Sequence, residues 1–131
     1  LSSVGFQQCY NNSLQDKVQI QHFGVESVAV MNPSSDKMNG LRTSLHQGLL
    51  NTLDFNYKNG SQNVLIYEQG AVFKNNGDKL EDIDQINGFS CLVHGDFAEP
   101  NVHFNPIQGN FFLLKGLAEG IFNNLLKIKI K

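Results

Sequence analysis

The chain contains no tryptophan, only three prolines and two cysteines, and no long uninterrupted run of apolar residues. A membrane-spanning helix needs about 20 consecutive apolar residues, so the sequence predicts no membrane span. Charge is also scarce, because charged residues make up 17% of the chain and the formal net charge is −2. Nucleic-acid binding depends on a basic surface that displaces counterions, and the only basic run here is Lys127, Lys129 and Lys131. We therefore expect no general nucleic-acid binding.

The composition is that of a folded protein rather than a disordered one. Hydrophobic residues make up 40% of 131 residues, which predicts a single globular domain over 1–131 with a real core. The first residue is Leu1 rather than Met, so we expect either a processed chain or a domain excised from a longer one. Nothing in the composition indicates a cellular compartment.

The two cysteines lie far apart in the sequence, at Cys9 and Cys91. A disulfide between them would close a long loop and would stabilise the fold by about 2–4 kcal/mol. Two separate buried thiols are the alternative. The sequence leaves both open.

The hydrophobic pattern predicts an α+β fold, with a mixed, largely antiparallel sheet and two main helices at about 35–53 and 110–126. The first helix follows from apolar residues at spacings of three and four between Met38 and Leu53. The remaining elements are expected as strands at 17–21, 27–31, 63–68, 71–74, 89–97, 102–105 and 127–131, a tight turn at 69–70, a turn at 75–78 and one or two helical turns at 80–86.

The segment 89–106 concentrates the polar chemistry of the chain. If its two strands pair across a turn at 98–101, Asp96 lies opposite His103 and His94 lies opposite Asn105. One face of this hairpin then carries His94, Asp96 and His103, with Glu99 nearby. Two histidines and a carboxylate are suitable ligands for zinc or iron, and an Asp–His pair suits a general base. The alternative is a solvent-facing hairpin whose polar residues serve only its register.

Two short stretches of this segment resemble known motifs. His94-Gly95-Asp96 followed by Asn101 resembles the catalytic loop of aminoglycoside and choline-type phosphotransferases, which implies a base at Asp96 and a metal ligand at Asn101. No Asp follows Asp96, so the second metal-binding Asp of that family is missing. The stretch 103–106 resembles the sugar-binding HFNPR stretch of galectins, but Ile107 replaces the arginine and no tryptophan is present to stack on a sugar.

A third resemblance concerns 27–36 (SVAVMNPSSD) and the helix expected after it. This arrangement resembles the first strand, loop and helix of macro domains, which bind ADP-ribose, and implies a nucleotide-type site that uses Asn32 and Ser34. The stretch 92–95 falls where that family has its second phosphate-side strand. The diphosphate-cradling glycine triplet is reduced to Asn39-Gly40, so the resemblance implies only a degenerate binding module.

The sequence thus carries no intact nucleophile motif, no phosphate-binding glycine loop and no metal set with convincing spacing. We therefore predict a non-enzymatic binding or interaction domain, with no catalytic residue, metal or cofactor. Its wide apolar stripe at 111–128 is consistent with docking on a protein partner or on a second copy of the chain, and the alternative is that the stripe belongs to the core of the domain. The alternatives are a small-ligand, macro-like module and a metal-dependent enzyme that uses His94, Asp96 and His103.

Overall fold

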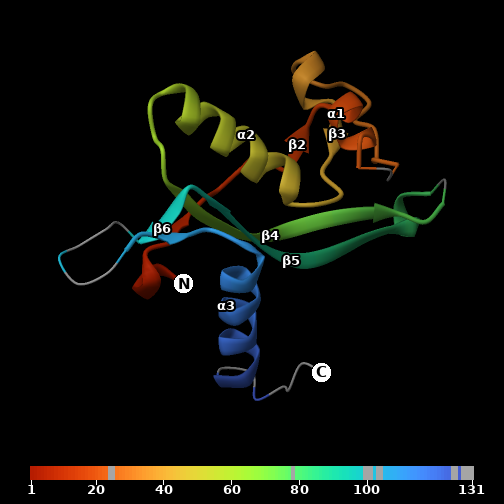
Figure 1. The fold of residues 1–131 in the computed structure, drawn as a ribbon. Helices are drawn as coiled ribbons and strands as arrows, with labels where there is room; N and C mark the ends of the chain where they lie inside the picture. The colour runs from red at the N-terminus through yellow and green to blue at the C-terminus, as the bar shows by residue number, and fades with distance from the viewer. Residues whose placement is uncertain (24–25, 78, 99–101, 103–104, 125–126, 128–131) are drawn as a thin grey trace.

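The computed structural model describes residues 1–131 except 24–25, 78, 99–101, 103–104, 125–126 and 128–131 (Figure 1). The predicted α+β class with a mixed, largely antiparallel sheet is confirmed. The elements in chain order are η1 (Ser2–Val4), β1 (Gln7–Gln8), β2 (Leu14–Gln15), α1 (Lys17–Gln21), η2 (Asp36–Met38), β3 (Gly40–Leu41), α2 (His46–Lys58), β4 (Val64–Asn75), η3 (Leu80–Asp82), β5 (Ile83–His94), β6 (Asp96–Ala98), β7 (Ile107–Gln108) and α3 (Phe111–Asn124).

The centre of the fold is a long antiparallel hairpin of β4 and β5, paired without interruption from Val64 opposite His94 to Asn75 opposite Ile83. The predicted turn after Asn75 is confirmed, but the predicted turn at 69–70 is wrong, because β4 runs straight through Gly70. A Cβ at Gly70 would collide with the guanidinium of Arg42, which passes over the strand there. The glycine therefore makes room for a side chain rather than for a turn. The predicted helical turns at 80–86 are also wrong beyond η3, because Ile83 begins β5.

Helix α2 covers one face of this hairpin (Figure 1). Its buried Leu49 packs on Val64 and Ile66 of β4, and the half-buried Leu53 and Leu92 complete this cluster. The first main helix was predicted at about 35–53, but it begins at His46 and continues to Lys58. The start is displaced because Gly40 and Leu41 form β3 and pair with β2. The last turn of α2 carries an exposed ion pair between Lys58 and Asp54, one helical turn apart.

The N-terminal segment crosses the same side of the hairpin as α2 (Figure 1). Strand β1 adds to β4 in parallel, so β1, β4 and β5 form one three-stranded sheet. The strand predicted at 17–21 is wrong: these residues form helix α1. Asp16 caps its N-terminus by accepting a hydrogen bond from the Val18 amide, which favours a helical turn over an extended strand. The strand predicted at 27–31 is reduced to a single bridge between Ala29 and Gly40.

Helix α3 lies on the other side of the hairpin from α2 and projects away from it (Figure 1). Its bounds, Phe111–Asn124, confirm the helix predicted at about 110–126. No described side chain of α3 is buried. The strand predicted at 127–131 lies outside the described residues, apart from Lys127.

Candidate functional site

Of the polar residues predicted to cluster on one hairpin, His94 and Asp96 are described, and their strand pairing differs from the prediction. His94 ends β5 opposite Val64 rather than opposite Asn105, and its ring meets the edge of Tyr57 at a centroid distance of 5.5 Å. Asp96 lies opposite Gln108 rather than opposite His103, and its amide donates to Oδ1 of Asn63. The predicted register is therefore wrong for both residues.

The physical cause is the residue between them. Gly95 adopts a φ of 77°, in the left-handed region, so the chain turns out of β5 before β6 begins. A Cβ there would also collide with Oδ1 of Asn63 and the carbonyl oxygen of Gln62. Glu99, Asn101 and His103 lie outside the described residues. Among the residues that are described, no group of three His, Cys, Asp or Glu side chains could hold a metal ion.

The loop expected to bind a nucleotide-type ligand is a solvent-facing segment in the structure. Asn32 and Ser34 are both exposed, in a stretch of bends before η2. The buried strand that should precede this loop in a macro-type site is missing, since only Ala29 makes a bridge. The structure therefore does not bring Asn32 and Ser34 to the end of a buried strand.

The two cysteines are free thiols, so the disulfide alternative is not supported. The amide of Cys9 donates to the carbonyl of Tyr67, and Cys91 lies opposite Tyr67 on the other side of β4. Two strand spacings, roughly 9–10 Å, separate residues so placed, whereas a disulfide needs Cα atoms less than about 7 Å apart. Burial raises the pKa of both thiols, and the Glu68 carboxylate raises the pKa of Cys9 further.

A buried ion pair that the sequence analysis missed holds the N-terminal segment to the hairpin. Nη1 of Arg42 lies 2.6 Å from Oε1 of Glu68, and the side chains are 4% and 2% exposed. Arg42 also donates to the carbonyl oxygens of Ala71 and Asn11, and Asn11 donates through Nδ2 to the second oxygen of Glu68. The hydroxyl of Thr52, on α2, donates to Oδ1 of Asn11. The sequence held one signal for this pair: Arg42 is the single arginine of the chain.

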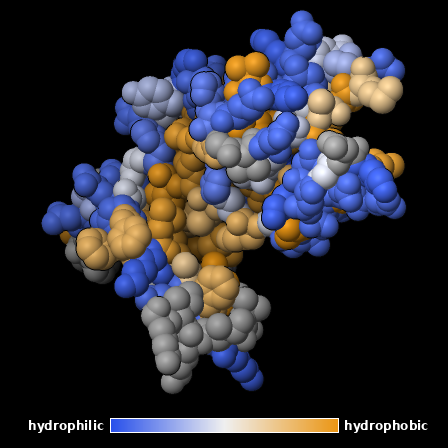
Figure 2. Space-filling model, turned by 90° about the vertical axis from the view of Figure 1, so that its right-hand side faces the viewer, coloured by the Kyte–Doolittle hydropathy of each residue, from blue (hydrophilic) through white to orange (hydrophobic). Residues whose placement is uncertain are grey.

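An apolar cavity of about 660 Å³ lies between α3 and the face of the hairpin that is turned away from α2. Tyr67 and Phe89 form its floor, with ring centroids 6.1 Å apart, and Leu114, Leu117 and Ile121 of α3 line its side. Next to it, Phe111 and Phe112 are 71% and 79% exposed. Figure 2 shows hydrophobic side chains gathered in a hollow at mid-height of one face, above the end of the molecule formed by α3. We call α3 and this floor the apolar face.

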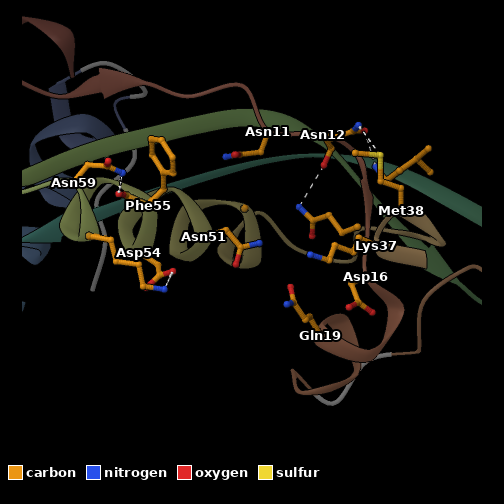
Figure 3. Close-up of a pocket in the computed structure, with 14 residues that line it drawn as sticks. Asn11, Asn12, Asp16, Gln19, Lys37, Met38, Asn51, Asp54, Phe55 and Asn59 are labelled. Carbon is orange, nitrogen blue, oxygen red and sulfur yellow. Dashed lines mark hydrogen bonds and ion pairs between the residues drawn. The ribbon is translucent and has the colours of Figure 1, made fainter. Parts of the chain in front are cut away.

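A second cavity, of about 560 Å³, lies on the α2 side of the hairpin and is lined mainly by polar residues (Figure 3). We call it the amide cleft, because most of its polar lining is Asn and Gln. Its lining residues are Asn11, Asn12, Leu14, Gln15, Asp16, Gln19, Lys37, Met38, Gly48, Asn51, Asp54, Phe55, Lys58 and Asn59. None of these was predicted as a site residue. The sequence shows that Asn and Gln are abundant, but this abundance does not indicate which of them come together in one cleft.

No helix among the described residues is long and apolar enough to cross a membrane. Helix α3 is 14 residues long and carries exposed apolar side chains. In an amphipathic helix of a folded domain the apolar stripe faces the core. Here the stripe is left half-covered.

Comparison with known proteins gives one consistent result. A family model described as the phenylalanyl tRNA synthetase beta chain CLM domain matches residues 1–130. The phenylalanine–tRNA ligase beta subunit of Streptococcus thermophilus is 35% identical over 97 residues, which is 73% of this chain and 12% of that protein. The same subunit of Staphylococcus saprophyticus is 30% identical over 129 residues, which is 95% of this chain and 16% of that protein. The chain thus spans less than a fifth of the length of these relatives.

These relatives also correct one expectation. They are named as subunits of a phenylalanine–tRNA ligase, which conflicts with the expectation of no general nucleic-acid binding. The charge argument considered the net charge of this chain alone. Net charge over a small fraction of a large enzyme does not decide which substrate the enzyme binds. The three resemblances drawn from short motifs were to other families.

Proposed function

The chain belongs to the family of phenylalanyl-tRNA synthetase beta chain CLM domains, and we propose that it is a non-enzymatic interaction module of a phenylalanine–tRNA ligase. In this proposal the apolar face docks on the companion subunit of the ligase. The relatives are named as beta subunits, so they belong to an assembly with at least one other kind of chain. The module forms a single domain, which supports the assembly while the chemistry on tRNA takes place elsewhere in the enzyme.

The observation that carries this proposal is the exposure of α3. The helix is rich in Phe and Leu, yet none of its described side chains is buried. Burying one large apolar side chain contributes about 1.5–3 kcal/mol, so covering Phe111, Phe112 and Phe122 alone would contribute several kcal/mol to docking. Aromatic residues are also enriched in the cores of protein interfaces. A partner surface that fills the apolar cavity accounts for both the cavity and the exposed rings.

The charged groups of the module support a structural role. Arg42 and Glu68 are bonded to each other and to neighbouring backbone or amide groups, so the buried charges already have partners. Charged groups whose hydrogen bonds are all made within the protein are suited to stabilising the fold rather than to transferring protons. The remaining described ion pairs, such as Lys58 with Asp54, lie on the surface.

The test is assembly of the ligase with one aromatic side chain of α3 replaced. Phe112→Asp places a carboxylate on the exposed first turn of α3, at the edge of the proposed contact, where its desolvation opposes docking if the partner covers this turn. We expect the companion subunit to elute separately from the variant in size-exclusion chromatography. Phe55→Asp is the matched control, because Phe55 is 68% exposed but lies on α2, on the other side of the hairpin.

Four results would contradict the proposal. One is normal assembly of the Phe112→Asp variant, and another is equal loss of assembly in both variants. The third is self-association of the chain through α3, seen by light scattering and abolished by Phe112→Asp, because the face would then be occupied by a second copy. If the assembled variant ligase instead loses affinity for tRNA while its subunits stay together, the apolar face serves tRNA contact and the protein-docking proposal fails.

A further inference from the structure

We propose that the amide cleft binds a nucleobase, either of a free nucleotide or of an unpaired nucleotide in RNA. The cleft lies on the α2 side of the hairpin, away from the apolar face (Figures 1 and 3). It is therefore a site separate from the proposed docking surface. The proposal rests on one buried acceptor, on amide donors near it, and on the shape and charge of the lining.

The buried acceptor is Oε1 of Gln15. The residue is only 8% exposed, and this oxygen has no hydrogen-bond partner among the described residues. Its identity as the oxygen is fixed by the other end of the amide, because Nε2 donates to the carbonyl oxygen of Asn12 at 3.3 Å. A buried polar atom without a partner costs about 1–3 kcal/mol. The oxygen is closed off in the free chain, so a ligand that donates to it and removes that cost must first displace the Gln15 side chain slightly toward the cleft.

The complementary donors come from Gln19 and Asn51. The Nε2 group of Gln47 donates to Oε1 of Gln19 and to Oδ1 of Asn51, at 3.0 and 2.9 Å. The side-chain oxygens of Gln19 and Asn51 thus both accept from Gln47. Their side-chain nitrogens remain as donors with no partner in the described part of the protein. The lining thus holds one buried acceptor without a partner and two exposed donors, all on primary amides. Asn and Gln amides pair with the adjacent donor and acceptor groups on the edge of a base, adenine above all.

The other lining groups suit a planar, weakly charged ligand. The volume of about 560 Å³ is within the range of small-molecule sites. Met38 and Phe55 provide apolar surfaces at opposite ends of the cleft (Figure 3), and a base can lie against such a surface. Lys58 is paired with Asp54, whereas Lys37 has no ion-pair partner among the described residues and is suited to a phosphate. With Asp16 also in the lining, the base rather than the phosphate dominates recognition.

The test is a titration of the chain with the four ribonucleoside monophosphates, with a short single-stranded RNA of mixed sequence, and with glucose as a neutral polar control. Nitrogen–proton NMR spectra follow the side-chain amides of Gln15, Gln19 and Asn51. We expect these signals to shift with at least one nucleotide or with the RNA, but not with glucose. Shifts with free nucleotides indicate a small-molecule site, and shifts with RNA alone indicate an RNA contact; both support the proposal.

Two variants decide whether the amides carry the binding. Gln15→Met keeps the length of the buried side chain but removes its acceptor. Asn51→Ala removes an exposed donor, so this second variant tests the site even if Gln15→Met is poorly folded. Losing a hydrogen bond of this kind corresponds to about tenfold weaker binding. Gln85→Ala, at an exposed amide on β5, should bind as the unaltered chain does. The proposal is overturned by an absence of nucleotide and RNA binding, by equal binding of glucose, or by binding that Asn51→Ala leaves unchanged. None of these results bears on docking through α3.

Discussion

Arg42 and Glu68 form a buried ion pair, with 2.6 Å between Nη1 and Oε1, which joins the segment before α2 to the middle of β4. The pair is supplemented by Asn11 and by the carbonyl of Ala71, so the N-terminal segment, α2 and the hairpin meet at one polar junction. The junction also helps to position one wall of the amide cleft, because Asn11 belongs both to the junction and to the cleft lining.

We predict that Glu68→Gln lowers the free energy of unfolding by about 3–5 kcal/mol, since it leaves the Arg42 guanidinium buried without a counter-charge. Urea unfolding measures this loss. Asp54→Asn is the matched control, because it breaks the exposed pair with Lys58 and should cost about 1 kcal/mol or less. Similar losses in the two variants would show that burial of the junction does not determine its strength.

Gly70 and Gly88 face each other across the hairpin and provide a second matched comparison. A Cβ at Gly70 would collide with Arg42, whereas a Cβ at Gly88 would make ordinary contacts of 3.5 Å with Leu45 and Val72. We expect Gly70→Ala to cost about 1–3 kcal/mol, as overpacking does, and Gly88→Ala to be close to neutral. Equal thermal stabilities of the two variants would contradict the packing of Arg42 over β4.

The two thiols predict a pH dependence. Burial raises the pKa of Cys9 and of Cys91 above the ordinary value of 9.0, and Glu68 raises the pKa of Cys9 further. As the pH rises through the ordinary thiol value, the unfolded chain loses these protons first. The native state then binds more protons, so the free energy of unfolding falls with increasing pH.

The measurement is urea unfolding at pH about 8 and about 10, compared with the variant Cys9→Ala/Cys91→Ala. The decrease between the two pH values should be smaller in the variant, because the tyrosines and lysines that titrate in this range are common to both proteins. An equal decrease would show that the thiols do not contribute. The mass of the unfolded chain should also be the same with and without reductant, since no disulfide joins the two residues.

The sequence predicted the elements whose pattern is long and uninterrupted. Helix α3 was placed within two residues of its bounds, because its apolar stripe continues over four turns. Shorter patterns misled: the alternation of Val18 and Ile20 covers too few residues to outweigh the helix cap provided by Asp16. Gly70 indicated a turn, because the side chain that needs its space is 28 residues away in the sequence.

The candidate sites were harder to predict, because they depend on contacts between distant segments. The polar cluster around His94 assumed that pairing continues across 98–101, whereas Gly95 ends β5 and Asp96 pairs with Gln108. The amide cleft combines the segment 11–19 with Lys37, Met38 and α2, and no local pattern links these stretches. The apolar stripe of α3 was visible in the sequence, but its exposure was not, since a buried helix has the same composition.

The most direct test of the central claim is hydrogen exchange of the α3 amides, measured in the chain alone and in the assembled ligase. A helix with no buried side chain opens easily, so we predict fast exchange of 113–122 in the free chain. In the ligase these amides should become as strongly protected as those of β4, whose exchange should change little. Equal exchange of the α3 amides in the two states would contradict the docking of this helix on a partner.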